Sequence, residues 1–178
     1  SPDKLRNFGN QCAANPTGVP CDYRIKGYSF DQNYKIILND RANWSFETIE
    51  SLDADIICYT DGSQMDTGSG AGVFFPGRNI NESYSLGKYT SVFQAEVYAL
   101  IEAARNTIML DQRGKKLVFC SDSQAALKTL AKKCSNSALV TECKDLLSRL
   151  ALYVYLVWVP GHSNVLEMRR RIAWLERD

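Results

Sequence analysis

The sequence is poor in several features that would point to common classes of protein. It contains a single histidine, and its six cysteines form no CxxC pair, so the usual zinc-binding spacings are missing. No apolar run approaches the roughly 18 residues of a membrane span, and no charged-then-apolar leader opens the chain. The formal net charge is only +1, so affinity for a polyanion has to come from local patches of charge.

The composition is that of a globular protein. The 178 residues are 45% hydrophobic and 23% charged, which is enough apolar material to bury a core. Cys58 and Cys120 lie within apolar runs, where a thiol behaves as a small hydrophobe. We therefore expect no disulfide framework and an intracellular, reducing compartment, with nucleus and cytoplasm not distinguished.

Residues 1–53 differ from the rest of the chain. Asn, Pro and Gly are scattered through residues 7–20, and only short apolar patches follow, such as residues 34–38. These features predict a linker or connector with one short strand, and a small subdomain packed on the main domain is an equally acceptable alternative. We place the domain boundary at residue 54 and expect residues 54–178 to form the main domain, with an atypical tail after residue 166.

From residue 55 onward the chain alternates between strand and helix patterns. We expect strands at residues 56–60, 70–75, 84–86, 117–120 and 153–159. A helix is expected to begin at Ser91, since apolar residues recur at helical spacing from Val97 to Ile108. Further helices are expected at residues 124–133, capped by residues 121–123, and at residues 137–151. This order predicts an α/β domain on a mixed sheet.

Three carboxylates fall near the ends of these elements. Asp61 is expected to end a strand, Glu96 to lie in the first turn of a helix, and Asp122 to sit at a strand-to-helix junction; strand ends and helix starts gather at one edge of an α/β sheet. Acids that converge there repel one another unless a divalent cation neutralises them, and Mg²⁺ suits an all-oxygen site. Each acid also has a simpler explanation, as a turn residue, a helix-dipole partner or an N-cap. The functional interpretation depends on the three together.

Four ordered motifs resemble those of the type 1 ribonuclease H domain. They read Thr-Asp-Gly-Ser at 60–63, Phe-Gln-Ala-Glu at 93–96, Ser-Asp-Ser-Gln-Ala-Ala-Leu at 121–127 and Trp-Val-Pro-Gly-His-Ser at 158–163. The amino-acid sequences of these motifs are most similar to the version in non-LTR retrotransposons of insect type, where the domain follows a reverse transcriptase. The resemblance covers about residues 54–166, and it implies a five-stranded mixed sheet flanked by helices.

The resemblance also implies an activity, namely hydrolysis of the RNA strand of RNA–DNA hybrids. Asp61, Glu96 and Asp122 would then be catalytic metal ligands for two Mg²⁺ ions, with Mn²⁺ as an alternative, in two-metal-ion cleavage. His162 would be catalytic as a proton shuttle during product release, although a solvent-exposed loop histidine is the simpler interpretation. The implied partners are the hybrid and an upstream reverse transcriptase in the same polyprotein, with no membrane.

Small polar groups beside the acids are candidates for contacts with sugar and phosphate, which recognition of a 2′-hydroxyl requires. The candidate nucleic-acid-binding residues are Gly62, Ser63, Ser123 and Gln124. Lys128, Lys132 and Lys133 add positive charge nearby, but such a cluster is more often a solvated helix face.

The sequence departs from the family pattern after the last of these motifs. The pattern continues with Gly-Asn and then Ala-Asp, whose Asp is a fourth carboxylate, whereas Ile172 occupies that position here by ungapped counting. Isoleucine cannot bind Mg²⁺, so impaired activity is expected, and the alternative function is a catalytically impaired hybrid-binding module that keeps the fold. One permitted set of codons for residues 167–172, read one base upstream, spells Gly-Asn-Ala-Pro-Ala-Asp. We therefore hypothesise that the tail after Leu166 is out of frame.

Overall fold

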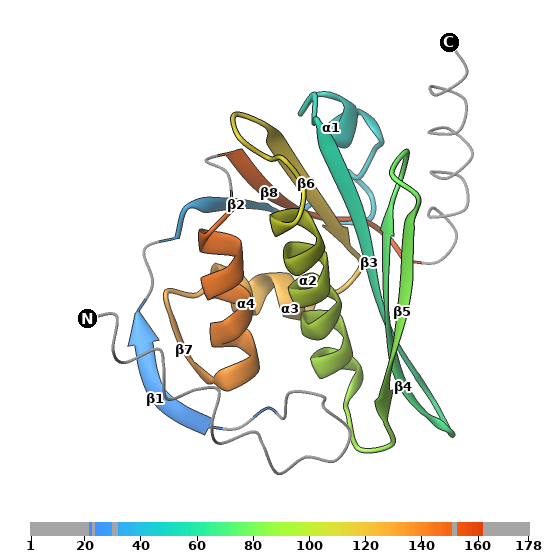
Figure 1. Ribbon diagram of the computed structural model, residues 1–178, viewed down its shortest axis with the longest axis vertical. Helices are drawn as coiled ribbons and strands as arrows, with labels where there is room; N and C mark the ends of the chain where they lie inside the picture. The colour runs from blue at the N-terminus through green and yellow to red at the C-terminus, as the bar shows by residue number, and fades with distance from the viewer. Residues whose placement is uncertain (1–21, 23, 30–31, 151–152, 162–178) are drawn as a thin grey trace.

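A mixed sheet forms the centre of the molecule. The computed structural model describes residues 22, 24–29, 32–150 and 153–161, and within them six strands pair in the order β2-β8-β6-β3-β4-β5 (Figure 1). They are β2 (Tyr34–Ile37), β3 (Ile56–Met65), β4 (Gly68–Phe75), β5 (Ile80–Gly87), β6 (Lys116–Ser121) and β8 (Tyr153–Trp158). The first four strands in that order are parallel, and β4 and β5 are antiparallel.

This arrangement confirms the predicted α/β class with a mixed sheet. The five strands expected from residue 56 onward are all present. The sixth, β2, comes from the apolar patch at residues 34–38 and pairs in parallel with β8, so a segment before residue 54 extends the central sheet. A further two-stranded pairing, which the sequence did not suggest, joins β1 (Arg24–Ser29) to β7 (Cys134–Ser137).

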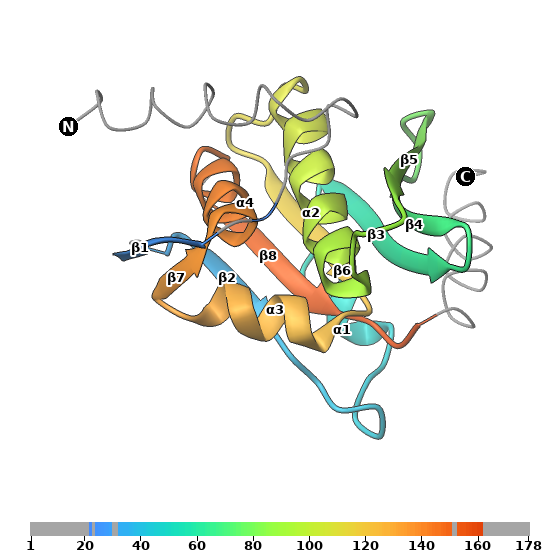
Figure 2. The same cartoon turned by 90° about the horizontal axis from the view of Figure 1, so that it is seen from below.

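Helices cover the sheet unequally on its two faces. They are α1 (Glu47–Glu50), α2 (Val92–Ile108), α3 (Gln124–Ala131) and α4 (Ala138–Ser148). One apolar core joins α2, α3 and α4 to one face of the sheet, and a second core lies on the other face with Ile49 of α1 (Figures 1 and 2). No helix in the described part of the chain is long and apolar enough to cross a membrane.

Strand alternation explains how one sheet supplies both cores. Cys58 and Phe119 face the larger core, whereas Tyr59 and Cys120, their neighbours in the chain, face the smaller one. The strands are therefore buried on both faces, which is why they appear in the sequence as nearly continuous apolar runs. The cysteines of the described residues are free, and burial raises the pKa of the Cys120 thiol, as expected for a cysteine that serves as a small hydrophobe.

Candidate functional site

The register of the parallel strands places two of the three predicted acids side by side. Thr60 of β3 pairs with Ser121 of β6, and Ser121 pairs with Trp158 of β8. Asp61 and Asp122 directly follow these paired residues, so Asp61 on β3 lies beside Asp122, the first residue after β6. The Thr60 hydroxyl also donates a hydrogen bond of 3.1 Å to the Cys120 carbonyl, which ties the two strands together next to the acids.

Asp61 lies inside a strand and not at its end. The strand was expected to stop at Thr60, but β3 continues to Met65, and Asp61 pairs with Gly72 of β4. The prediction that the strand ends at Asp61 was therefore wrong. Backbone pairing with β4 outweighs the low strand propensity of Asp, Gly and Ser, because this part of the hairpin extends beyond the core, where polar side chains are exposed. The explanation of Asp61 as a plain turn residue is excluded.

Glu96 is buried on α2, with only 4% of its surface exposed. The helix begins at Val92 after a capping box formed by Ser91 and Gln94, so Glu96 belongs to the second turn and not to the first, as had been expected. A dipole partner would occupy the first turn, where α2 has no acid. The position of Glu96 serves the site instead, because it directs a carboxylate toward the edge of the sheet.

A glycine makes room for this carboxylate. A Cβ at Gly62 would lie 2.5 Å from the Glu96 backbone nitrogen and 2.8 Å from its Cδ, so no larger residue fits. The Gly62 backbone N–H also hydrogen-bonds to the Glu96 carboxylate, which offsets part of the rise in the Glu96 pKa that burial causes. Gly62 therefore contributes to the site through its small size and its backbone, by letting α2 pack closely on β3.

Asp122 does not act as the N-cap of the helix that follows it. The hydroxyl of Ser123 accepts the capping hydrogen bond from the Ala126 N–H at 3.2 Å, which leaves the Asp122 side chain directed toward the other acids. The indole Nε1 of Trp158 donates a 3.0 Å hydrogen bond to the Asp122 carbonyl, so β8 holds the backbone of this residue. A Cβ at Gly161 would overlap with Asp122 Oδ2.

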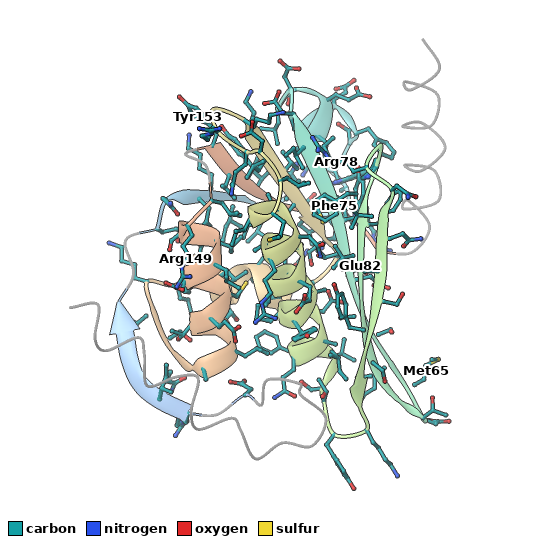
Figure 3. The ribbon with its side chains drawn as sticks, in the orientation of Figure 1. Met65, Phe75, Arg78, Glu82, Arg149 and Tyr153 are labelled. Atoms are coloured by element: carbon teal, nitrogen blue, oxygen red, sulfur yellow. The ribbon has the colours of Figure 1, made fainter. Side chains whose placement is uncertain are left out.

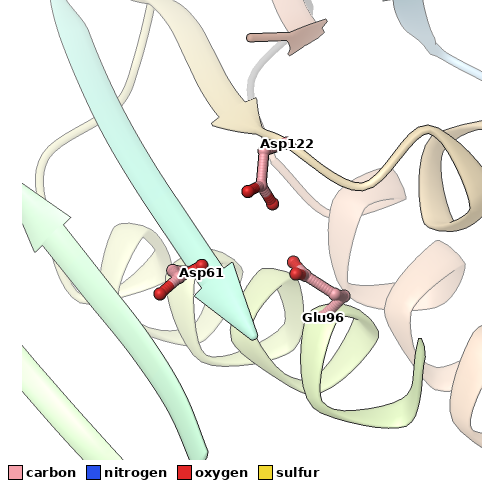
Figure 4. Close-up of side chains that lie close together, drawn as sticks. All are labelled: Asp61, Glu96 and Asp122. Carbon is pink, nitrogen blue, oxygen red and sulfur yellow. The ribbon is translucent and has the colours of Figure 1, made fainter. Parts of the chain in front are cut away.

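The three carboxylates point toward one another from β3, α2 and the end of β6 (Figure 4). One oxygen from each lies within 4.8 Å of the other two. Burial, followed by the negative charge of Asp122, raises the pKa of Glu96 from 4.5 to about 8. Within the part of the chain that the structure describes, Glu96 Oε2 is buried and receives no hydrogen bond.

These features fit a divalent cation. Three carboxylates at this spacing are hard oxygen ligands of the kind that Mg²⁺ and related ions prefer. A buried oxygen without a partner is costly, and a bound cation would compensate for it while reversing the unfavourable repulsion between Glu96 and Asp122. Gly161 leaves room for the Asp122 carboxylate, because a Cβ at that position would lie too close to Asp122 Oδ2.

The predicted nucleic-acid contacts flank this cluster, and two of them have structural partners. Ser63 is exposed on β3, next to half-buried Gly62. The Ser123 hydroxyl accepts the helix-capping bond, and Gln124 Oε1 accepts a 3.3 Å hydrogen bond from the Lys128 ammonium. His162 and Ile172 lie outside the described residues.

Two contributors to the site were not foreseen from the sequence. Gly161 and Trp158 were named in the sequence only as members of the motif at 158–163, and no contact with the acids was predicted for either residue. Both lie within the motif at 158–163, and both contact Asp122. The usable signal was the glycine directly after Pro160, since a glycine there allows a close approach of the backbone to another group.

Comparison with known proteins supports the same assignment. The family model described as RNase H matches residues 53–170, a span that contains all three acids. No match is found among curated proteins. Because the family match covers well over half of the 178 residues, and because the acids it spans form one cluster, the chain belongs to the ribonuclease H family.

Proposed function

We propose that this chain is an endonuclease that cuts the RNA strand of RNA–DNA hybrids with two divalent cations held by Asp61, Glu96 and Asp122. Membership of the ribonuclease H family implies hydrolysis of the RNA strand of a hybrid, and proteins of this family use divalent metals. The observation that carries the finer proposal is the convergence of the three carboxylates within 4.8 Å. Mg²⁺ is the expected ion, with Mn²⁺ as an alternative.

Bound cations of this kind activate an attacking water and stabilise the leaving oxygen of an in-line displacement at phosphorus. The residues of the chain would hold such cations in position. Asp61 projects from a strand fixed on both sides by pairing, and the backbone of Asp122 is held by the hydrogen bond from Trp158. Such rigidity keeps the ligand oxygens in place without a reorganisation cost during the reaction.

Glu96 contributes a carboxylate that is buried and close to a second negative charge. In the absence of a cation it favours the protonated form at neutral pH, because its pKa is raised to about 8. Cation binding would therefore release a proton from this group near neutral pH. Because Glu96 must lose this proton to bind a cation, we expect the affinity for metal to increase with pH.

The substrate contacts that we propose lie beside the acids. Ser63 offers an exposed hydroxyl, and the start of α3 at Ser123 and Gln124 offers polar groups at a helix N-terminus, which suits a phosphate. Gly62 leaves room for Glu96 beside Asp61, and we propose that it contacts the hybrid through its backbone. Contact with a 2′-hydroxyl at this level would distinguish the RNA strand from DNA.

We assign proton transfer during product release to His162, on the motif at 158–163. The amino-acid sequences of the four motifs support descent from a retrotransposon, with a reverse transcriptase upstream in the same polyprotein. An intracellular compartment is supported by the free buried thiols of Cys58 and Cys120.

A cleavage assay tests the proposed function. An end-labelled RNA strand is annealed to DNA and incubated with the protein and Mg²⁺, and the products are separated on a denaturing gel. We expect internal cuts in the RNA strand that disappear with EDTA, and no cutting of a labelled DNA strand or of RNA paired with RNA. Cleavage that persists in EDTA, or that ignores the nature of the paired strand, would contradict the proposal.

The second candidate function is a hybrid-binding module with impaired catalysis. It is favoured by one observation, the isoleucine at position 172 where the family pattern has a carboxylate. A gel-shift experiment separates the two functions: binding of the hybrid without cleavage, at Mg²⁺ and Mn²⁺ concentrations that saturate binding, supports the second.

A further inference from the structure

Two neighbouring turns carry a group of exposed apolar side chains that the site described above does not use. Of the seven large hydrophobic side chains that are exposed in the described residues, three lie on or next to these turns: Tyr89 at 96%, Met65 at 69% and Val92 at 42%. Exposed Lys88 lies beside Tyr89. We call these four residues the tip surface. Single exposed hydrophobics are ordinary, but a group of them marks a contact surface.

The two turns lie against each other. Met65 pairs with Gly68 at the end of the β3–β4 hairpin, and a Cβ on Gly68 would lie 3.3 Å from the Gly87 carbonyl and 3.7 Å from the Lys88 nitrogen. Figure 1 shows the hairpin and the β5–α2 connection at the same end of the molecule. The tip surface is therefore one surface, although its residues come from two parts of the chain.

Hydrogen bonds hold the turn that carries Tyr89. Ser69 Oγ donates to the Thr90 carbonyl, and Thr90 Oγ1 donates to the Leu86 carbonyl at 2.7 Å. Gly87 supplies the left-handed backbone at φ 80°, and the capping box at Ser91 fixes the start of α2. The tyrosine ring is thus presented to solvent from an ordered turn, which reduces the entropy lost when a ligand binds to it.

The tip surface lies within reach of the substrate that the acid cluster would cut. Val92 and Glu96 are one turn apart on α2, about 6 Å along its axis. Tyr89 precedes Val92 by three residues, so its Cα lies at most about 17 Å from that of Glu96. A strand of duplex rises about 3.4 Å per nucleotide, which places Tyr89 within about five nucleotides of the reacting phosphate.

We propose that Tyr89 is a positioning residue for the hybrid: its ring packs on a sugar of the nucleic-acid backbone a few nucleotides from the cut, while Lys88 contacts an adjacent phosphate. The inference rests on the proposed function. Three side chains are too few for a stable protein interface, which needs on the order of 1,000 Å². Partial burial of one aromatic ring against a sugar is already worth about tenfold in affinity. Asp66, exposed at the hairpin tip, repels phosphate and directs the backbone toward the Lys88 side.

The test compares Tyr89→Ala with a matched control, Tyr153→Ala. Tyr153 is also exposed, at 55%, but it begins β8 and so lies at the other end of the molecule from Met65 (Figure 3). Affinity for the hybrid is measured by fluorescence anisotropy in an Asp122→Asn background, in which cleavage is expected to be roughly 10²- to 10³-fold slower. The Kd is expected to rise about tenfold with Tyr89→Ala, because the apolar contact of the ring is lost, and to be unchanged with Tyr153→Ala. Tyr89→Phe should keep most of the affinity because the ring is retained.

Steady-state kinetics and the length of the substrate distinguish a contact between Tyr89 and the hybrid from a general effect of the substitution on the fold. In the otherwise native chain, Tyr89→Ala should raise KM about tenfold and leave kcat nearly unchanged, because the contact is made equally before and during the reaction. A DNA duplex with a short ribonucleotide block fixes the place of the cut. As the flanking duplex is trimmed stepwise, the loss should persist with about eight base pairs and disappear at a length no greater than about five.

The outcomes distinguish this inference from the proposed function. Native chain that cleaves the hybrid, with Tyr89→Ala equal to it in Kd and KM, overturns the role of Tyr89 alone. A loss that is the same for Tyr153→Ala, or that does not depend on duplex length, also overturns it. Native chain that neither binds nor cleaves the hybrid overturns both.

Discussion

The edge of the sheet that holds the acids and the segment at residues 34–52 contribute to the molecule in different ways. We call the part of the sheet edge at Asp61, Glu96 and Asp122 the acid edge. It depends on small, local features: the register of two strands, a glycine packed against Glu96 and a glycine next to Asp122. The segment at residues 34–52, which we call the cover segment, contains β2, a loop and α1. It adds a strand to the sheet and places Trp44, Phe46 and Ile49 over the second core.

The cover segment is joined to the rest of the fold by long-range contacts. The Tyr34 hydroxyl donates a 2.8 Å hydrogen bond to the Leu130 carbonyl, and Asn33, next to the segment, donates to the Ser148 carbonyl at 2.9 Å. The family model begins at residue 53, after this segment. The candidate catalytic acids therefore lie within the span that matches the family model. Part of the second core, by contrast, is covered by residues that precede that span. We propose that the folding unit includes residues 34–52.

The largest effect that would sharpen this comparison comes from Asp122→Asn. The change removes one metal-binding charge but keeps the size of the side chain, and the hydrogen bond from Trp158 reaches the backbone, which is unaltered. Loss of several kcal/mol of transition-state stabilisation should slow hybrid cleavage roughly 10²- to 10³-fold. Without metal the free energy of unfolding should stay the same or rise, because the repulsion of Glu96 is relieved.

Initial cleavage rates and urea denaturation check this prediction. Asp111→Asn is the control, because Asp111 is an exposed aspartate in the loop after α2, away from the cluster. A fall in stability that matches the fall in rate would mean that Asp122 is structural, and the distinction between the two regions would then fail.

Next in size is the dependence of metal-free stability on pH. The pKa of Glu96 is about 8 in the folded chain and close to 4.5 when unfolded, so the folded state binds the proton more tightly. Its stabilising contribution is complete below about pH 4.5 and is lost as the pH rises toward 8. Urea denaturation in EDTA should therefore give a free energy of unfolding that is lower at pH 8 than at pH 5, by a few kcal/mol.

Glu96→Gln supplies the control for this measurement, because the amide does not titrate and the slope between pH 5 and 8 should flatten. Mg²⁺ at pH 8 should recover stability in the native chain and not in the variant, since a ligand that binds only the folded state stabilises it. Equal slopes for the two proteins would assign the pH dependence to other groups.

Trp44→Ala tests the cover segment. Trp44 packs against both cores and forms an edge-to-face pair with Phe46, at 4.9 Å between ring centroids. Its removal should lower the free energy of unfolding by about 3 kcal/mol, near the lower end of large aromatic truncations because the ring is only partly buried. The specific cleavage rate of the folded fraction should not change. Thermal denaturation and cleavage below the transition measure the two quantities.

Trp44→Phe provides the conservative comparison. In the described residues Trp44 Nε1 is buried without a hydrogen-bond partner, so replacing the indole by a benzene ring removes an unsatisfied donor and offsets part of the lost packing. We expect a loss smaller than half of that caused by Trp44→Ala. A cleavage rate that falls with either variant in the fully folded state would show that the cover segment contributes to catalysis as well as to stability.

The acid edge could be predicted from the sequence because its signals are local. Ser91 and Gln94 spell a capping box, and the apolar run before Asp122 ends where the strand ends. The errors at this edge are also local. The predicted end of β3 was wrong because pairing with β4 carries the strand through Asp61, and Glu96 lies one turn further along its helix than expected.

The cover segment could not be placed in this way. The pairing of Tyr34 with Val154 joins residues that are far apart in the chain, and a period of two in a four-residue strand does not specify its partner. The same holds for β7, whose sequence is Cys-Ser-Asn-Ser and carries no apolar pattern. Elements like these depend on tertiary contacts that only the folded chain reveals.

The smallest expected change concerns Ile172, which departs from the family pattern in the sequence. If the position corresponds to a fourth carboxylate, Ile172→Asp should strengthen binding of the second cation and raise Mg²⁺-dependent cleavage about tenfold. Ile172→Asn has a similar size without the charge and should give no such gain. The rate is measured against Mg²⁺ concentration, because a restored ligand should also lower the concentration needed for half-maximal activity. Sequencing the coding DNA around Leu166 tests the frame hypothesis separately, since codons that cannot spell Gly-Asn and Ala-Asp one base upstream would exclude it. A gain from Asn equal to that from Asp would show that the change acts through packing, and the acid edge would then be complete with three carboxylates.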